Sequence, residues 1–314
     1  MRIFCCFFGL TLFYSSCIKE VHNNFDFEEK IVVYSYPNTS DSIIKLILLN
    51  NQPVSASLEN NNEKLPYLKN ATVTISDGNK STLLTFYEGN SESFYYTDSN
   101  SLKFEEGKNY YLNINSPDGR YARSSLKIPH SSNILSASVD TSSVAKITLY
   151  DNMMSISREV TLSVNLNAAN AYHFVYAKVY GRTIWYDNKD TSNYSTVEDF
   201  YFNPNSSLPL QLNGSQILST KNEIGVATNF KTIDFFSVEI DSVEFILITV
   251  EENYYKFLKS KQIQSSNTND PFAEPALLFS NIENGLGVFT GLTTRSKKII
   301  LDQSRVISNK VIKL

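Results

Sequence analysis

Short runs of β-branched and aromatic residues, separated by turn-forming dipeptides, most strongly constrain how this chain can fold. Residues 71–76 alternate apolar and polar side chains, and Asp77-Gly78 separates them from a second run at 81–87. Such alternation is typical of a strand with one buried face and one face in water, and Asp-Gly is a strong signal for a tight hairpin turn. The pattern therefore predicts antiparallel β-sheet.

The same pattern recurs throughout residues 25–130. Further strands are predicted at 30–36, 42–49, 107–115 and 121–128. A Ser-Pro-Asp-Gly turn separates the last two. Short strands joined by hairpins predict a β-sandwich, immunoglobulin-like or transthyretin-like in outline. Pro, Ser and Asn residues then cluster where the strand pattern breaks, so we expect this domain to end at residue 130.

Residues 131–314 continue in strands and are expected to form a second β-rich domain. Strands are predicted at 159–166 and 172–180, separated by a short Asn/Ala turn, and at 237–250. Directly afterwards, apolar side chains recur at helical spacing, which predicts one amphipathic helix over residues 251–262. The expected fold is therefore all-β, with two sandwich-like domains and a single helix that covers the end of a sheet domain.

Residues 187–207 are rich in Asn, Ser and Asp, and we interpret them as a long polar surface loop. Several of its side chains could supply oxygen ligands to calcium, namely Asp187, Asn188, Asp190 and Asn193. They lack the spacing and the glycine of an EF-hand, so a solvated loop is the favoured interpretation.

Aromatic residues lie beside and within this polar segment. They are Trp185, Tyr194, Phe200, Tyr201 and Phe202. Such residues either form a contact patch for a sugar or a protein, or fold back onto their own domain. We take Trp185 and Tyr201 as candidate partner contacts.

The N-terminus has the organisation of a secretion signal with a lipid-attachment site. Arg2 precedes an apolar stretch at 3–13 that is too short to span a bilayer, and small residues lead to Cys17. This arrangement resembles the lipobox of bacterial lipoproteins, although Tyr14 departs from its usual leucine. It predicts a signal peptide at 1–16, lipidation of Cys17, a tether at 17–24 and attachment to a membrane through acyl chains.

Several classes of site have no counterpart in the sequence. The net charge is −4 and no Lys/Arg cluster is interleaved with aromatic residues, so nucleic-acid binding is not expected. His22, His130 and His173 lack metal-ligand spacing, and no nucleophile elbow, phosphate loop or dinucleotide fingerprint is present. We therefore predict no catalytic residue, cofactor or metal. A glycan hydrolase remains a less favoured alternative, because paired carboxylates meet in space rather than in sequence.

Two C-terminal segments, 270–275 (DPFAEP) and 278–289 (LFSNIENGLGVF), resemble a family of Bacteroidota lipoproteins catalogued as domain of unknown function 4249. The residues at 17–20, 70–75 and 107–112 are similar to it too. The chain departs from the family pattern at Asn284, where a second glycine is frequent. The resemblance implies an outer-membrane lipoprotein, often encoded beside TonB-dependent transporters, and it supplies no catalytic residues.

The Gly285-Leu286-Gly287 sequence predicts a turn or bulge that needs positive φ or close backbone approach. Such a turn either closes the second domain or lines a docking edge for a partner protein. On the second interpretation, Gly285, Gly287 and Phe289 join Trp185 and Tyr201 as possible partner contacts.

The expected function is an accessory binding or lid component of a TonB-dependent nutrient transporter, an outer-membrane β-barrel. The alternative is a structural or adhesive envelope lipoprotein. In both cases the protein is expected at the outer membrane, anchored through Cys17.

Overall fold

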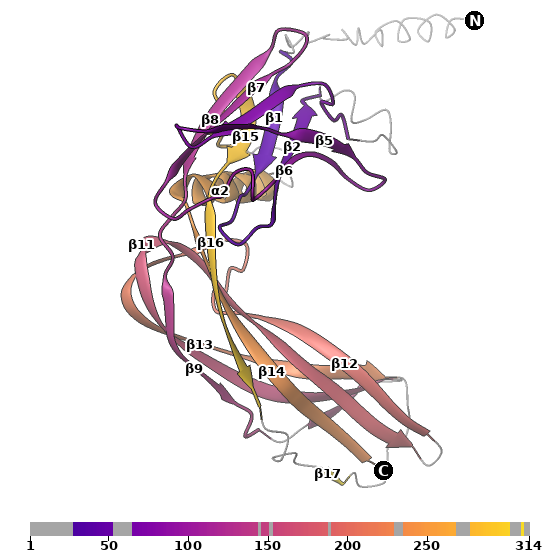
Figure 1. Cartoon of the computed structure of the whole chain (residues 1–314). Coiled ribbons are helices and arrows are strands. Elements are labelled where there is room, and N and C mark those ends of the chain that lie inside the picture. The colour runs from indigo at the N-terminus through magenta and orange to yellow at the C-terminus, as the bar shows by residue number, and fades with distance from the viewer. Residues whose placement is uncertain are drawn as a thin grey trace, which may run out of the picture.

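Two β-sheet units lie end to end, with one helix at their junction (Figure 1). The computed structural model describes residues 28–52, 65–143, 146–150, 153–187, 190–228, 235–267, 277–301 and 309–310. The predicted signal peptide, Cys17 and the tether lie outside these residues. No helix in the described part of the chain has both the length and the apolar content that crossing a bilayer requires.

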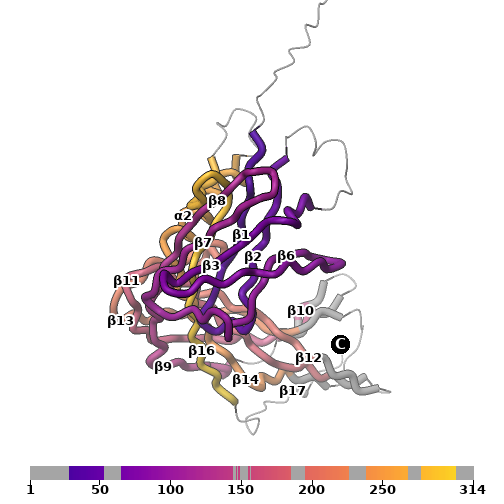
Figure 2. Tube along the Cα trace, turned by 45° about the horizontal axis from the view of Figure 1, so that its top comes forward, coloured from indigo at the N-terminus to yellow at the C-terminus, as the bar shows by residue number. Residues whose placement is uncertain are grey.

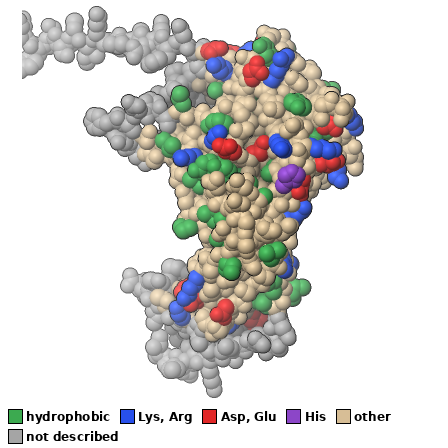
Figure 3. All heavy atoms as spheres, turned by 90° about the vertical axis from the view of Figure 1, so that its left-hand side faces the viewer, with side chains coloured by type: hydrophobic (Ala, Val, Ile, Leu, Met, Phe, Trp, Pro, Cys, Tyr) green, Lys and Arg blue, Asp and Glu red, His purple; other side chains and the backbone are tan. Residues whose placement is uncertain are grey.

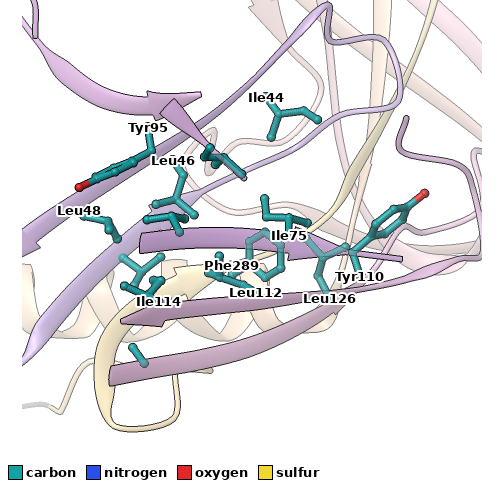
Figure 4. Packing of buried hydrophobic residues seen from close by; sticks show 14 of the residues in the cluster. Ile44, Leu46, Leu48, Ile75, Tyr95, Tyr110, Leu112, Ile114, Leu126 and Phe289 are labelled. Carbon is teal, nitrogen blue, oxygen red and sulfur yellow. The ribbon is translucent and has the colours of Figure 1, made fainter. Parts of the chain in front are cut away.

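The N-terminal unit is a sandwich-like pair of sheets, as predicted. Its sheets have the strand orders β15-β1-β2-β6-β5 and β4-β3-β7-β8. The bounds are β1 Ile31–Ser35, β2 Ile43–Asn50, β3 Thr72–Ser76, β4 Ser81–Leu83, β5 Thr85–Glu88, β6 Ser93–Asp98, β7 Asn109–Asn115, β8 Tyr121–Lys127 and β15 Gly285–Phe289. Alternate residues of both sheets meet in one core, in which Leu46, Ile75 and Leu112 are completely buried (Figure 4).

Two predicted hairpins are confirmed, β3–β4 and β7–β8. Their turns contain Gly78 and Gly119, which have φ of 93° and 89°. The predicted strand at 81–87 is in fact two strands. β4 pairs with β3, whereas β5 pairs with β6 in the opposite sheet, and the chain changes sheets at the buried Leu84. The sequence analysis also missed β6.

The second unit is organised around one very long strand, β11 (Met153–Asp187). Its first half pairs with β9, β10 and β13, and its second half with β12 and β14; β16 extends the sheet beyond β14 (Figure 2). The bounds are β9 Asn133–Asp140, β10 Lys146–Tyr150, β12 Asp190–Tyr201, β13 Leu210–Thr228, β14 Phe235–Val250, β16 Leu292–Ile300 and β17 Asn309–Lys310.

This sheet curls back on itself to enclose a second core. β12 contacts β13, and β9 contacts β16, so the outer strands of the two halves of β11 approach each other. Alternate side chains from the first half of β11 therefore pack with alternate side chains from its second half. The residues of β11 in this one buried cluster include Val160, Leu162, Val164, Leu166, Val175, Ala177 and Val179. The resulting body is sandwich-like, with β11 belonging to both layers.

Two predictions for this unit are wrong. The Asn/Ala segment before Tyr172 is not a turn, because β11 continues through it with a register irregularity between Ala168 and Ala171. The predicted loop at 187–207 contains β12, which pairs with β11 along its length. Val197, Glu198 and Asp199 of β12 are exposed, so the polarity of this segment reflects solvent contact on a paired strand.

Strand β15 lies in the range assigned to the second domain but pairs in the first sandwich. It runs parallel to β1, with Gly287 opposite Val33 and a Gly287 φ of 99°. The interpretation that this Gly-Leu-Gly segment closes the second domain is therefore wrong. The predicted close backbone approach is confirmed, since a Cβ on Gly287 would clash with the Val33 carbonyl oxygen. From β15 the chain passes directly into β16 of the other unit.

Gly287→Ala should destabilise the protein by about 3 kcal/mol or more, because the methyl group adds an overpacked contact to positive-φ strain. Gly119→Ala is the matched control, since Gly119 also has positive φ but nothing within 4 Å of the added carbon. We expect only about 1 kcal/mol there. Urea unfolding of both variants measures the difference, and equal losses would contradict the close-packing argument.

Candidate functional site

Helix α2 (Glu252–Asn267) confirms the predicted helix, extends it by about one turn and packs between the two units. The Tyr254 ring lies 5.1 Å from Tyr36 of the N-terminal unit and 6.2 Å from Phe174 on β11. Tyr255 stacks on Tyr172 at 4.2 Å. Aromatic pairs of this kind contribute about 0.5–1.5 kcal/mol each beyond their burial. The helix therefore packs against both units at their junction. The prediction that it covers the end of a sheet domain is wrong.

Glu251, immediately before the helix, joins three segments of the chain. Its Oε1 accepts a hydrogen bond from the Lys127 N–H at 2.7 Å, at the end of β8. Its Oε2 accepts from the Thr290 hydroxyl at 3.0 Å and the Gly291 N–H at 2.9 Å, where the chain crosses from β15 to β16. Burial raises the pKa of Glu251, and the three hydrogen bonds act in the opposite direction.

Glu106 forms a second carboxylate contact across the junction. Its Oε2 accepts from the Ser131 N–H at 2.9 Å and the Ser131 hydroxyl at 3.0 Å, while Oε1 accepts from Arg295 Nη2 at 2.8 Å. Burial alone would raise the pKa of Glu106, but the Ser131 hydrogen bonds and the charge of Arg295 hold it below its usual value.

Ser132 and His173 form a buried pair beside these contacts. Ser132 Oγ lies 2.7 Å from His173 Nε2, and both residues are at most 1% exposed. Because Ser132 Oγ accepts the Ala169 N–H at 2.8 Å, its own hydrogen is available to the imidazole. Burial lowers the pKa of His173 to about 4, so the ring is neutral near pH 7. The pair supplies a hydrogen-bond acceptor for the Ala169 N–H at the irregularity in β11. Its burial gives a substrate no access to the Ser132 hydroxyl.

A cleft of about 470 Å³ opens at this junction, between the end of β8, the irregular part of β11 and the start of α2. Its lining includes His130, Asn170, Tyr172, Gln211 and Glu252. Glu251 also reaches it but accepts three hydrogen bonds, and Glu252 is ion-paired with Lys256 at 3.0 Å. In the ranges described above, no three His, Cys, Asp or Glu side chains gather as a metal site would require.

The five residues expected to contact a partner do not come together. Phe289 is completely buried in the N-terminal core, and Gly287 is buried against β1. Gly285 lies beside Ile31 in the same sheet. Tyr201 belongs to the other unit, where it is 44% exposed and stacks on Tyr176. The backbone of Trp185 lies in β11, opposite Phe236 and Ser192. The structure does not describe its side chain.

The aromatic residues around Tyr201 do not form one exposed patch. Phe200 and Phe202 are buried in the second core, so they fold back onto their own unit, and Tyr201 faces out. The calcium-ligand set near residue 188 includes Asn188, which lies outside the described residues. Sequence reasoning did not find Glu106, Glu251 or Ser132, because each acts on residues far away in the chain.

The junction and all but the last strand residues of the two units fall within a single family match. A family model described as "Domain of unknown function (DUF4249)" matches residues 18–298. The chain belongs to this family. The match includes β15, whose glycines carry the resemblance noted in the sequence, and it reaches nearly to the end of β16. The family description assigns no enzymatic activity. A search of curated proteins gave no match.

Glu251→Ala should destabilise the protein by about 3 kcal/mol, because it leaves two backbone N–H groups and a hydroxyl without their acceptor. Glu252→Ala changes the neighbouring residue, which makes an exposed ion pair worth only about 0.3–0.5 kcal/mol. Denaturant unfolding of the two variants checks this, and equal effects would show that the Glu251 carboxylate does not hold the junction.

Stability should also depend on pH through Glu106. Its folded pKa lies below the usual glutamate value of 4.5, so its ionised form contributes stability above that pH. This contribution is lost as the pH falls through the folded pKa. The difference in unfolding free energy between the natural protein and Glu106→Gln should therefore be largest near neutral pH and shrink below 4.5. A difference that grows on acidification would reverse the assigned direction.

Proposed function

We propose that this protein is a lipid-anchored outer-membrane component that binds or covers a partner, working with a TonB-dependent transporter in nutrient uptake. The observation that carries the proposal is the junction, where helix α2 and two carboxylates fix a long curved sheet to a compact sandwich (Figure 1). A body held in one shape can present a surface at a set distance from its anchor, which is what a lid or accessory binding protein requires.

The direction of β1 agrees with an anchor at the N-terminal side. The carbonyls of Ser35, the last residue of β1, and of Pro37 accept hydrogen bonds from the N–H groups of Thr290 and Leu292 at the junction. The start of the strand therefore points toward the opposite end of the unit, away from the long strands (Figure 1). A tether attached there would leave the second unit projecting from the membrane.

The exposed surface also fits a binding role in the envelope. Positive and negative side chains are mixed across the face in Figure 3, with hydrophobic side chains scattered among them. This is the pattern of a solvated surface and gives no support to nucleic-acid binding. The buried polar groups that resemble catalytic ones, such as Ser132 and His173, have structural partners.

The second candidate is a structural or adhesive envelope lipoprotein, with the two units acting as a spacer. It is favoured by the exposed apolar side chains on the long strands, including Ile217 at 76% and Val197 at 59% exposure. A pull-down from native membranes in mild detergent separates the two functions. Near-stoichiometric recovery of a TonB-dependent transporter supports the first; recovery of the lipidated protein alone supports the second.

Cys17→Ala should abolish membrane association and the mass added by acyl chains, because each buried methylene contributes about 0.8 kcal/mol to anchoring. Cys6→Ala is the control, since that cysteine would leave with the signal peptide. Membrane fractionation and intact-mass spectrometry measure both variants. Unchanged fractionation of Cys17→Ala would refute the anchor.

A further inference from the structure

The sheet β4-β3-β7-β8 is extended at its edge by residues from the far end of the chain. Arg123 on β8 and Glu283 exchange backbone hydrogen bonds of 3.1 and 2.8 Å, and the Ser124 hydroxyl donates to the Asn281 carbonyl at 2.8 Å. A groove of about 350 Å³ runs over β7, β8 and this added segment. It lies on the N-terminal unit, with a lining different from that of the junction cleft.

The outer face of the groove presents an aromatic ring beside planar polar groups. Tyr111, which is 46% exposed, lies opposite Ser125, and Asn113 lies opposite Arg123. The turn beside Tyr111 contains Gly78, where even an added Cβ would lie 3.9 Å from the ring, so no side chain at that position covers it. One lining strand thus supplies the ring and an amide, and the next supplies a hydroxyl and a guanidinium.

Three polar side chains of the groove have no partners among the residues that the structure describes, whereas Ser124 and Asn281, which also line it, are bonded within the chain. Asn113, Ser125 and Glu283 make no side-chain hydrogen bond or ion pair there. Arg123 on β8 and Glu283 on the added segment are direct neighbours yet form no ion pair; the guanidinium lies over the Tyr121 ring, 5.4 Å from its centroid. Donors and acceptors are therefore held on a rigid sheet with their hydrogen-bonding capacity open.

We infer that this groove is a binding site for a neutral oligosaccharide. The face of Tyr111 can stack against the C–H groups of a pyranose ring, since an aromatic face is apolar and electron-rich. The amide, hydroxyl, guanidinium and carboxylate can bond to sugar hydroxyls, and bonds to charged groups are the stronger ones. Arg123 and Glu283 leave the groove without net charge. An anion would meet the carboxylate, and a metal ion would find only one.

The length of the face suits an oligosaccharide rather than a single sugar. Tyr121 lies opposite Asn115, four residues along β7 from Tyr111. At about 3.4 Å per residue, the two tyrosines are offset by roughly 14 Å along the strands. Asn113 and Arg123 lie between them. This inference does not depend on the lipid anchor or on a transporter.

The test is calorimetric titration of the purified full-length protein with cellohexaose, laminarihexaose and maltohexaose, each up to roughly 10 mM, where a Kd of about 1 mM would be close to saturation. Any detergent must carry an amine-oxide headgroup, because maltoside and glucoside headgroups are themselves sugars. Tyr111→Ala should weaken binding about tenfold or more, which corresponds to about 1.4 kcal/mol. Glu283→Gln, which keeps the shape but removes the charge, should weaken it less.

Tyr87→Ala is the matched control, because Tyr87 is similarly exposed, at 49%, but lies on β5 in the other sheet. It should leave the Kd unchanged. Binding that is lost in Tyr111→Ala and kept in Tyr87→Ala supports the site. If none of the three probes binds, or if binding survives Tyr111→Ala in a variant with a normal melting temperature, the inference is overturned.

Discussion

One partly buried carboxylate, that of Glu251, joins the segments at which the two units meet. Glu251 accepts hydrogen bonds from the end of β8, from the β15–β16 crossing and, through its own backbone, from the first turn of α2. Removing a carboxylate from water is costly unless its oxygens are satisfied, so the arrangement is stable only when all three segments are in place. Ring packing is weakly directional, whereas these hydrogen bonds fix the position of α2 relative to β8 and to the β15–β16 crossing.

The long strand β11 depends on that junction in turn. A strand of 35 residues cannot remain straight and enclose a core, so it must bend where its two layers separate. The bend falls between Ala168 and Ala171, and Ser132 accepts the Ala169 N–H released from the ladder. The buried His173 fixes Ser132 from the other side. The Ser–His pair is therefore explained by strand geometry and not by nucleophilic chemistry.

Local pattern was enough to predict the elements whose partners are close in sequence. The turns at Gly78 and Gly119 and the helix after Val250 were found because their signals lie within a few residues. β12 was missed because an exposed paired strand can be as polar as a loop. Neither the pairing of β15 with β1 nor the partners of Glu251 could be predicted, since those contacts join segments that are far apart in the chain.

The polar residues of this protein divide into two groups by what they contact. Glu106, Ser132, His173 and Glu251 resemble the components of an active site, yet each is bonded to the chain at the junction. Asn113, Arg123 and Glu283 lie on an outer sheet face, where hydrogen bonding to a ligand would displace no ion pair. Groups of the types found in active sites thus hold the fold together at the junction, whereas the polar groups without partners lie on a rigid outer sheet face.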